Sequence, residues 1–142
     1  QCAHFYGHGD PDHVPSMLQN ITAQRYRDVE AAKQMVSEEE LRKQTEAFEA
    51  SNGGTLDLFE RIASEEPEMA LAAEFKRASP SKGDIAIGVD VGKQGSMYAS
   101  AGAAVLSVLT EPMWFKGSLE DMKDVRRATQ GVRVGKTGMR QV

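Results

Sequence analysis

The sequence is short of cysteine, long apolar runs and excess positive charge, and each shortage excludes a class of protein. Its single cysteine, Cys2, cannot form an internal disulfide, which is typical of reduced, intracellular proteins. No apolar stretch approaches the roughly 20 residues that a membrane-spanning helix needs. The 21 acidic residues outnumber the 17 basic ones, so the net charge is -4 and the basic surface of a nucleic-acid-binding protein is missing. We therefore expect a protein that binds neither membranes nor nucleic acid.

The remaining composition is that of an ordinary globular protein. The chain has 142 residues, of which 40% are hydrophobic and 27% charged. A chain of this length usually buries an adequate core. The first residue is Gln1 rather than Met, so we expect the true N-terminus to be missing, and with it any targeting peptide. A cytoplasmic location is predicted, with a plastid as the alternative.

Helices are predicted before any strand. Residues 1–15 are rich in Gly, His, Asp and Pro and are predicted to form a disordered tail, whereas 16–66 are predicted to form a helical extension. Within it, Ser37 and Glu40 form a capping-box pattern, in which each side chain accepts a hydrogen bond from the other's backbone. The helix that follows is expected to turn three side chains inward: Leu41, Thr45 and Phe48. Thr55 is expected to cap a further short helix whose apolar side holds Leu58, Phe59 and Ile62.

From residue 67 the pattern changes to alternating strands and helices. A strand is predicted over 69–76, then a loop over 77–88 that is rich in Ser, Pro, Lys and Gly. A helix should follow over 90–101, although Gly92 and Gly95 reduce its intrinsic helix propensity.

A second unit of the same kind follows. The continuous apolar run 103–110 is typical of a strand that is buried on both faces. Ser118 and Asp121 then cap another helix, whose predicted inner positions are Leu119, Met122 and Val125. This alternation implies a parallel sheet with right-handed crossovers, and 67–130 therefore contain two strand–helix units.

Charged side chains lie at the carboxyl end of the first predicted strand. Because successive side chains point to opposite faces, Leu71, Ala73 and Phe75 share an apolar face, while Glu74 and Lys76 share the other. Ligands of α/β sheets bind at the carboxyl ends of strands, so this pair is a candidate site. The alternative is that the charges only reach solvent or form a structural ion pair. The loop beyond carries hydroxyls and a lysine suited to an anionic group, which alone is a weak indication.

The order of the residues is more specific than their chemistry. Glu74–Gly83 reads Glu-Phe-Lys-Arg-Ala-Ser-Pro-Ser-Lys-Gly, and similar patterns continue through Tyr98–Glu111 and Phe115–Ser118. Upstream, Met17–Arg25 matches in the same way. Together these segments resemble indole-3-glycerol phosphate synthase over residues 16–129.

The resemblance implies a (β/α)8 barrel, here partial, with an N-terminal helical extension. It implies a carboxy-lyase of tryptophan biosynthesis that closes the ring of 1-(2-carboxyphenylamino)-1-deoxyribulose 5-phosphate, with loss of CO2 and water and without a cofactor or metal. Lys76 would contact the substrate carboxylate and donate a proton, and Glu74 would orient that lysine and take part in proton transfer. Ser79 would help to hold this phosphorylated small molecule, and Phe115 would line the pocket for its aromatic ring. Fusion or association with other tryptophan-pathway enzymes is a further implication.

The end of the chain departs from the family. The family's third strand ends in Leu-x-Lys-Asp-Phe, whereas 131–142 hold no such motif, so the role of its lysine is not carried over to Lys136. The glycines and Lys136 imitate a phosphate-binding P-loop, but with the wrong spacing and without a preceding strand. We expect a divergent tail and a fragment that is inactive by itself. The alternative is a short, inactive product that acts as an interaction or barrel-completing module.

Overall fold

A computed structural model describes residues 16–52, 55–64, 69–134 and 139–140. The predicted disordered tail, 1–15, and Lys136 lie outside the described residues. The chain divides between Thr55 and Leu56 into two compact units. Each unit is described by itself.

The described part of the first unit contains two helices, α1 (Met17–Met35) and α2 (Glu38–Asn52). Ser16 caps α1 because its hydroxyl accepts from the Gln19 N–H at 3.3 Å while the Gln19 side chain accepts from the Ser16 N–H at 2.7 Å. At the start of α2 the Ser37 hydroxyl accepts from the Glu40 N–H at 3.1 Å, which is one half of the predicted capping box, while the Glu40 carboxylate accepts from the Gln44 side chain at 2.9 Å. The three inward positions predicted on α2, Leu41, Thr45 and Phe48, are wrong because all three are exposed.

The second unit begins with α3 (Leu58–Ala63), and here two predictions were wrong. The helix is capped by Asp57, whose carboxylate accepts from the N–H groups of Phe59 and Glu60, and not by Thr55. The residues predicted as its apolar side, Leu58, Phe59 and Ile62, are exposed. The predicted helical extension, 16–66, includes α3, whereas the contacts within the chain place α3 in the same unit as the elements that follow it. The limits of the domains stay a prediction.

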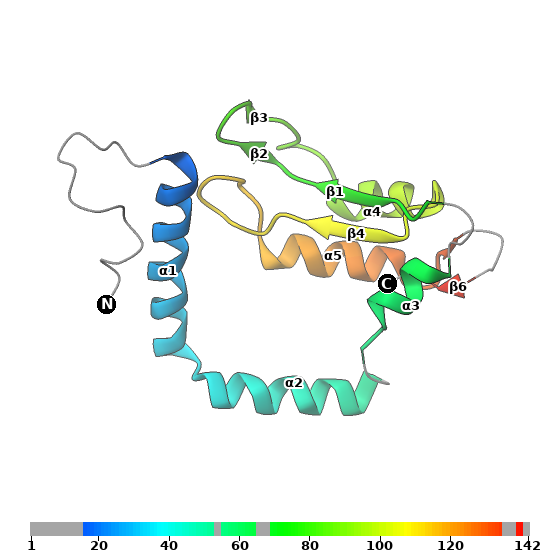
Figure 1. Cartoon of the computed structure of the whole chain (residues 1–142), viewed down its shortest axis with the longest axis horizontal. Helices are drawn as coiled ribbons and strands as arrows, with labels where there is room; N and C mark the ends of the chain where they lie inside the picture. Colours follow the sequence, from blue (N-terminus) through cyan, green and yellow to red (C-terminus); the bar gives the residue numbers. More distant parts are fainter. Residues whose placement is uncertain (1–15, 53–54, 65–68, 135–138, 141–142) are drawn as a thin grey trace. The chain divides into compact units, whose positions relative to one another are not determined.

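Two parallel strands form the centre of the second unit. β1 (Ala72–Phe75) pairs with β4 (Val105–Val108), with Glu74 opposite Ser107 and Phe75 opposite Val108. The helix α4 (Val91–Ser100) connects them, and α5 (Leu119–Thr129) follows β4, so both predicted strand–helix units are present (Figure 1). Their core contains Phe75, Val91 and Val125, with partly buried Ala86, Tyr98, Leu106 and Val108 packed against it.

The predicted loop 77–88 is more ordered than expected. It contains a small antiparallel hairpin of β2 (Ala78–Ser79) and β3 (Gly83–Asp84). At the other end of the unit, β5 (Arg133–Val134) pairs antiparallel with β6 (Met139–Arg140). Among the described residues, none of these four short strands extends the β1–β4 sheet.

The helix α5 buries a different face from the one predicted. Ser118 and Asp121 form the predicted capping box, and Val125 is buried as expected. However, Leu119 and Met122 are 62% and 47% exposed, and the other buried residues are Asp121 and Thr129. The apolar pattern was misleading because Asp121 has a charged partner on another segment, which makes its burial tolerable.

The two glycines of α4 allow close contact with α5. A Cβ atom added at Gly95 would lie 2.8 Å from Cγ1 of Val125, and one at Gly92 would lie 3.3 Å from the Cβ of Ala128. Low helix propensity therefore coincides with tight helix packing, in which the absence of a side chain is the useful property.

Replacing Gly95 by alanine is expected to lower the free energy of unfolding by about 1–3 kcal/mol, because Val125 is buried and β-branched and has little freedom to move. In an exposed helix the same change would be stabilising by about 1 kcal/mol. Urea unfolding followed by circular dichroism measures the difference. Gly88→Ala is the matched control, since nothing lies within 4 Å of a Cβ added there. Equal stability of the two variants would contradict the close packing.

Candidate active site at the carboxyl ends of the strands

Glu74 and Lys76 meet at the end of β1. The Lys76 Nζ lies 2.8 Å from Oε1 of Glu74, and the two side chains are 38% and 43% exposed, respectively. Both project from the face of the sheet opposite the core, because Phe75 between them is buried. Ser107 of β4 is paired with Glu74 and adds an exposed hydroxyl to the same face. The structure thus brings together the two residues that strand alternation predicted.

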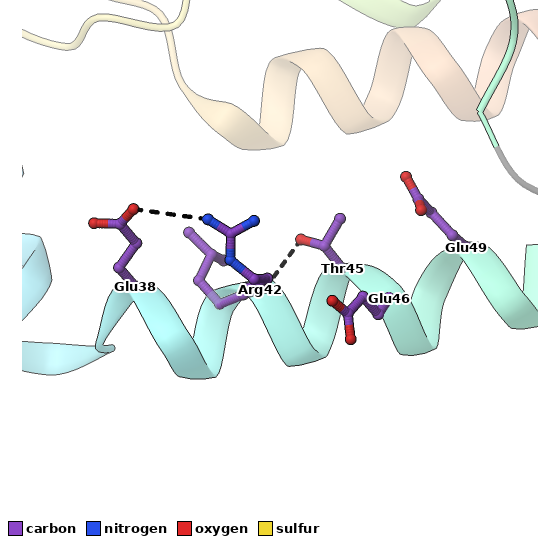
Figure 2. Close-up of a pocket in the computed structure, with 6 residues that line it drawn as sticks. Glu38, Arg42, Thr45, Glu46 and Glu49 are labelled. Atoms are coloured by element: carbon purple, nitrogen blue, oxygen red, sulfur yellow. Dashed lines mark hydrogen bonds and ion pairs between the residues drawn. The ribbon is translucent and has the colours of Figure 1, made fainter.

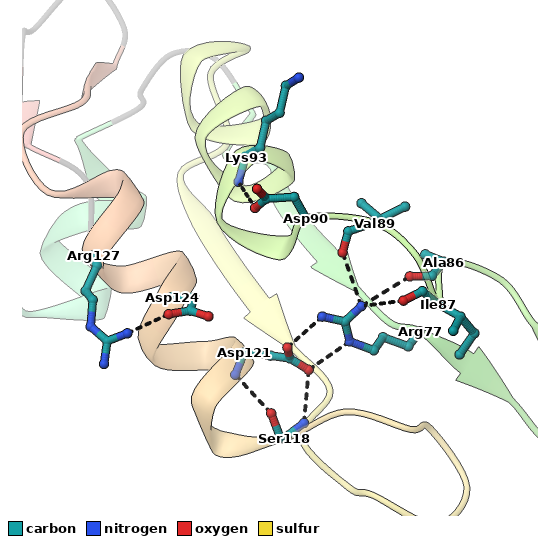
Figure 3. A network of polar contacts seen from close by, with 10 residues as sticks. All are labelled: Arg77, Ala86, Ile87, Val89, Asp90, Lys93, Ser118, Asp121, Asp124 and Arg127. Atoms are coloured by element: carbon teal, nitrogen blue, oxygen red, sulfur yellow. Dashed lines mark hydrogen bonds and ion pairs between the residues drawn. The ribbon is translucent and has the colours of Figure 1, made fainter.

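Arg77, the next residue along, has a different role that the sequence did not reveal. Its guanidinium makes a bidentate pair with Asp121, with Nε–Oδ2 and Nη2–Oδ1 distances of 3.0 and 2.7 Å (Figure 3). Nη1 donates to the carbonyl oxygens of Ile87 and Val89 at 3.0 and 3.2 Å. The guanidinium carbon also lies 5.4 Å from the ring centre of Phe75. Arg77 therefore joins the end of β1, the segment before α4 and the start of α5.

The electrostatics of this pair follow from its hydrogen bonds. The guanidinium of Arg77 lowers the pKa of Asp121 by hydrogen bonding, against the opposing effect of burial, and the Ser118 N–H, which donates to the same carboxylate, lowers it further. In return the Asp121 carboxylate raises the pKa of Arg77. Both groups are charged at neutral pH, and the pair is a fixed part of the scaffold beneath the site.

Ser79 lies in the β2–β3 hairpin. Its hydroxyl accepts from the Lys82 N–H at 3.2 Å and lies 3.5 Å from the hydroxyl of Ser81. The neighbouring residue, Ala78, is buried, and its N–H donates to the carbonyl of Phe115 at 3.1 Å. The backbone of Phe115, in the loop after β4, therefore lies against the backbone that carries Ser79.

An ion pair also joins these two loops. The Lys116 ammonium contacts the Asp84 carboxylate of β3. Lys116 has a φ of 54°, in the left-handed region that non-glycine residues seldom adopt. The next residue, Gly117, lies so close to the preceding chain that a Cβ added there would be 1.8 Å from the carbonyl oxygen of Leu109. Only glycine fits at this turn.

The structure thus places the four predicted site residues in two groups. Glu74 and Lys76 are in direct contact, while Ser79 and Phe115 lie on two loops that are hydrogen bonded to each other. Roles of these residues towards a substrate stay predictions. Sequence reasoning missed Arg77, Ser107 and Glu111, whose carboxylate accepts hydrogen bonds from the backbone of the Phe115 loop. Ser107 could have been found from strand register. Glu111 binds only backbone amides, and Arg77 binds backbone carbonyls together with Asp121, which is 44 positions away, so neither arrangement leaves a local sequence pattern.

Other surfaces of the described residues offer less. A hollow on α2 is lined by residues of that single helix, including Glu38, Arg42 and Thr45 (Figure 2). Glu38 and Arg42 form a long ion pair of 4.0 Å there, with both side chains exposed. Within the described ranges, no group of three or more His, Cys, Asp or Glu side chains is placed to hold a metal ion, and none of the helices has the length and apolar character to cross a membrane.

Comparison with known proteins decides the family. The sequence model of the family described as indole-3-glycerol phosphate synthase matches residues 18–139. This chain belongs to the indole-3-glycerol phosphate synthase family. As a member of this family of (β/α)8 barrels, it has an α/β fold, and its β1–α4 and β4–α5 segments are two strand–helix units of a partial barrel.

Relatives of this synthase-family chain include fungal and bacterial proteins. A multifunctional tryptophan biosynthesis protein of Phycomyces blakesleeanus is 46% identical over 120 residues, which is 83% of this chain and 15% of the relative. The protein of the same description from Schizosaccharomyces pombe is 42% identical over 117 residues, or 82% of this chain and 15% of the relative. The indole-3-glycerol phosphate synthase of Listeria monocytogenes serovar 1/2a is 38% identical over 112 residues, or 79% of this chain and 40% of the relative. The chain thus spans between 15% and 40% of these relatives.

Proposed function

We propose that this chain supplies the first wall of an indole-3-glycerol phosphate synthase active site. The reaction is the ring closure of 1-(2-carboxyphenylamino)-1-deoxyribulose 5-phosphate, with release of CO2 and water. The observation that carries the proposal is the Glu74–Lys76 contact at the carboxyl end of β1, within the segment that matches the family. In barrel enzymes this end of the strands is where the reacting groups lie.

The chemistry of the pair suits this reaction. The Lys76 ammonium would bind the substrate carboxylate and donate a proton during ring closure. Glu74, which lies 2.8 Å from that ammonium, would orient it and help to transfer the proton. Removal of water by the completed barrel would strengthen both interactions, because the effective dielectric constant falls.

The two loops would complete this wall. Ser79 would help to hold the substrate from the β2–β3 hairpin, and Phe115 would line the place of the aromatic ring. The hydrogen bond from Ala78 to Phe115 supports a shared position for these loops. Since the fungal relatives are described as multifunctional tryptophan biosynthesis proteins, we further propose that the chain acts in fusion or association with other enzymes of that pathway.

A second function, that of an interaction or barrel-completing module, is favoured by a different observation. Among the described residues, β1 and β4 pair only with each other, so each leaves one edge open. Open edges offer unpaired backbone groups to another strand. In this case the chain would be inactive and would bind a protein that supplies the missing strands.

A chimeric barrel distinguishes the two functions. Residues 18–129 of this chain would replace the matching segment of the Listeria monocytogenes synthase, so that the bacterial protein supplies the remaining strands. We expect this chimera to form indole-3-glycerol phosphate, which is detected by its indole absorbance and by growth of a tryptophan auxotroph. A chimera that folds cooperatively but gives no turnover would contradict the synthase proposal and favour the module.

A further inference from the structure

The loop between β4 and α5 is built around one carboxylate, that of Glu111. Its Oε1 accepts from the Met113 N–H at 3.0 Å, and its Oε2 accepts from the N–H groups of Trp114 and Phe115 at 2.6 and 3.2 Å. Hydrogen bonds from backbone amides to an ionised acceptor are roughly twice as strong as those between neutral groups. Three consecutive amides therefore converge on a single side chain.

The rest of the loop is arranged so that this carboxylate accepts from the backbone N–H groups that have no other acceptor in the loop. Residue 112 is proline, which has no N–H to satisfy and fixes its own φ. The Gly117 N–H returns to the carbonyl of Glu111 at 3.1 Å and closes the loop at its base. Without the Glu111 carboxylate, three neighbouring amides would lose their acceptor and the loop would have to find another conformation.

The position of this loop is transmitted to the candidate site through Phe115. The N–H of Phe115 is held by Glu111, and its carbonyl accepts from Ala78 beside Ser79. Its side chain is partly buried. A change at Glu111 would therefore move Phe115 relative to the end of β1, although the carboxylate of Glu111 itself contacts only backbone N–H groups of the loop.

We propose that Glu111 is a positioning residue that fixes Phe115, through the backbone of residues 113–115, in the place where the aromatic ring of the substrate binds. This inference rests on the proposed synthase function. It assigns no chemical step to Glu111. Its effect is on substrate affinity, because apolar contact with a ring acts similarly in the ground state and in the transition state.

The first test uses the intact chain and its single tryptophan, Trp114, which lies in the loop itself. Glu111→Ala is expected to increase acrylamide quenching of Trp114 fluorescence and to shift the emission to longer wavelength. Glu111→Gln keeps one oxygen acceptor and should lie between the parent and the alanine variant. Glu120→Ala, an exposed acid on α5 that pairs with Arg127, is the matched control and should leave the emission unchanged. Emission that is the same in all four proteins would overturn the inference.

The second test is a double-mutant cycle in the chimeric barrel. Glu111→Ala and Phe115→Ala are each expected to raise KM roughly 10-fold, the effect of losing part of an apolar contact, with kcat changed by less than about 3-fold. If Glu111 acts through Phe115, adding Glu111→Ala to Phe115→Ala should give no further rise in KM. A merely structural role would give additive effects on KM in the double variant, which would overturn the inference.

The two tests separate this inference from the function on which it rests. An inactive parent chimera counts against the synthase proposal, and the fluorescence comparison then still decides whether Glu111 holds the loop. An active parent with unchanged KM in Glu111→Ala counts against the positioning role alone.

Discussion

Replacing Arg77 by methionine is expected to lower the free energy of unfolding by about 3–5 kcal/mol. The change removes a largely buried guanidinium, whose side chain is 17% exposed, and leaves the Asp121 carboxylate, which is 12% exposed, without its charged partner. It also removes the donor to the carbonyl oxygens of Ile87 and Val89. Urea unfolding at pH 7, followed by circular dichroism, measures the loss.

The control is Arg127→Met on the outer face of α5. Arg127 also makes a close ion pair, with Glu120 at 2.8 Å, but its side chain is 61% exposed. Exposed ion pairs contribute little to stability because solvent screens them, so this variant should remain close to the parent. Equal losses in the two variants would show that Arg77 does not organise the fold.

The loss of unfolding free energy caused by Arg77→Met should become smaller as the pH falls into the acid range. Because the pKa of Asp121 is lowered in the folded chain, its stabilising effect is complete above the unfolded value of about 3.9 and disappears as the pH falls through the lower folded value. The stability difference between the parent and Arg77→Met should therefore be constant near neutral pH and decrease in acid. A difference that stays constant below pH 4 would contradict the assigned cause.

Lys76→Met in the chimeric barrel is expected to lower kcat by roughly 10²- to 10⁴-fold, the range for loss of a positioned proton donor. Its effect on stability should be small, because the Lys76 side chain is 38% exposed and the ion pair with Glu74 is solvated in this structure. Steady-state rates and thermal unfolding are measured on the same preparation. Glu74→Gln should also lower kcat, because the amide cannot hold the ammonium by charge.

Lys123→Met is the matched control for this prediction. Lys123 is also a lysine in an exposed ion pair, with Glu120 at 3.3 Å, but it belongs to the helix α5 and not to the end of a strand. We expect this variant to keep the rate of the parent. If Lys76→Met keeps it as well, the Glu74–Lys76 contact is a structural ion pair and not part of an active site.

Local sequence signals predicted the fold well where the two residues that interact lie only a few positions apart in the chain. The Ser118–Asp121 capping box is one such case, since the whole interaction fits within four residues. Local reasoning failed where a distant segment decides the outcome. Gly95 reduces helix propensity, yet Val125 on another helix requires that no side chain be there. Leu119 and Met122 match an apolar pattern, but α5 buries Asp121 because Arg77 is available to pair with it.

The candidate site shows the same division. Strand alternation was sufficient to place Glu74 and Lys76 on one face, because the period of two fixes which residues are neighbours. Ser79 and Phe115 came from the family resemblance and not from any local rule. Glu111 could not be predicted from the pattern, since any residue can supply the backbone amides that its carboxylate holds.

The Arg77–Asp121 pair also has a consequence for the order of folding during synthesis. The two residues are 44 positions apart, so at 5–20 residues per second the ribosome needs about 2–9 s to add Asp121 after Arg77. Throughout that interval the nascent β1–α4 segment has a guanidinium without its carboxylate. The β1–α4 segment should therefore become stable only when the amino end of α5 has been translated. The two strand–helix units, β1–α4 and β4–α5, should then fold in one cooperative step.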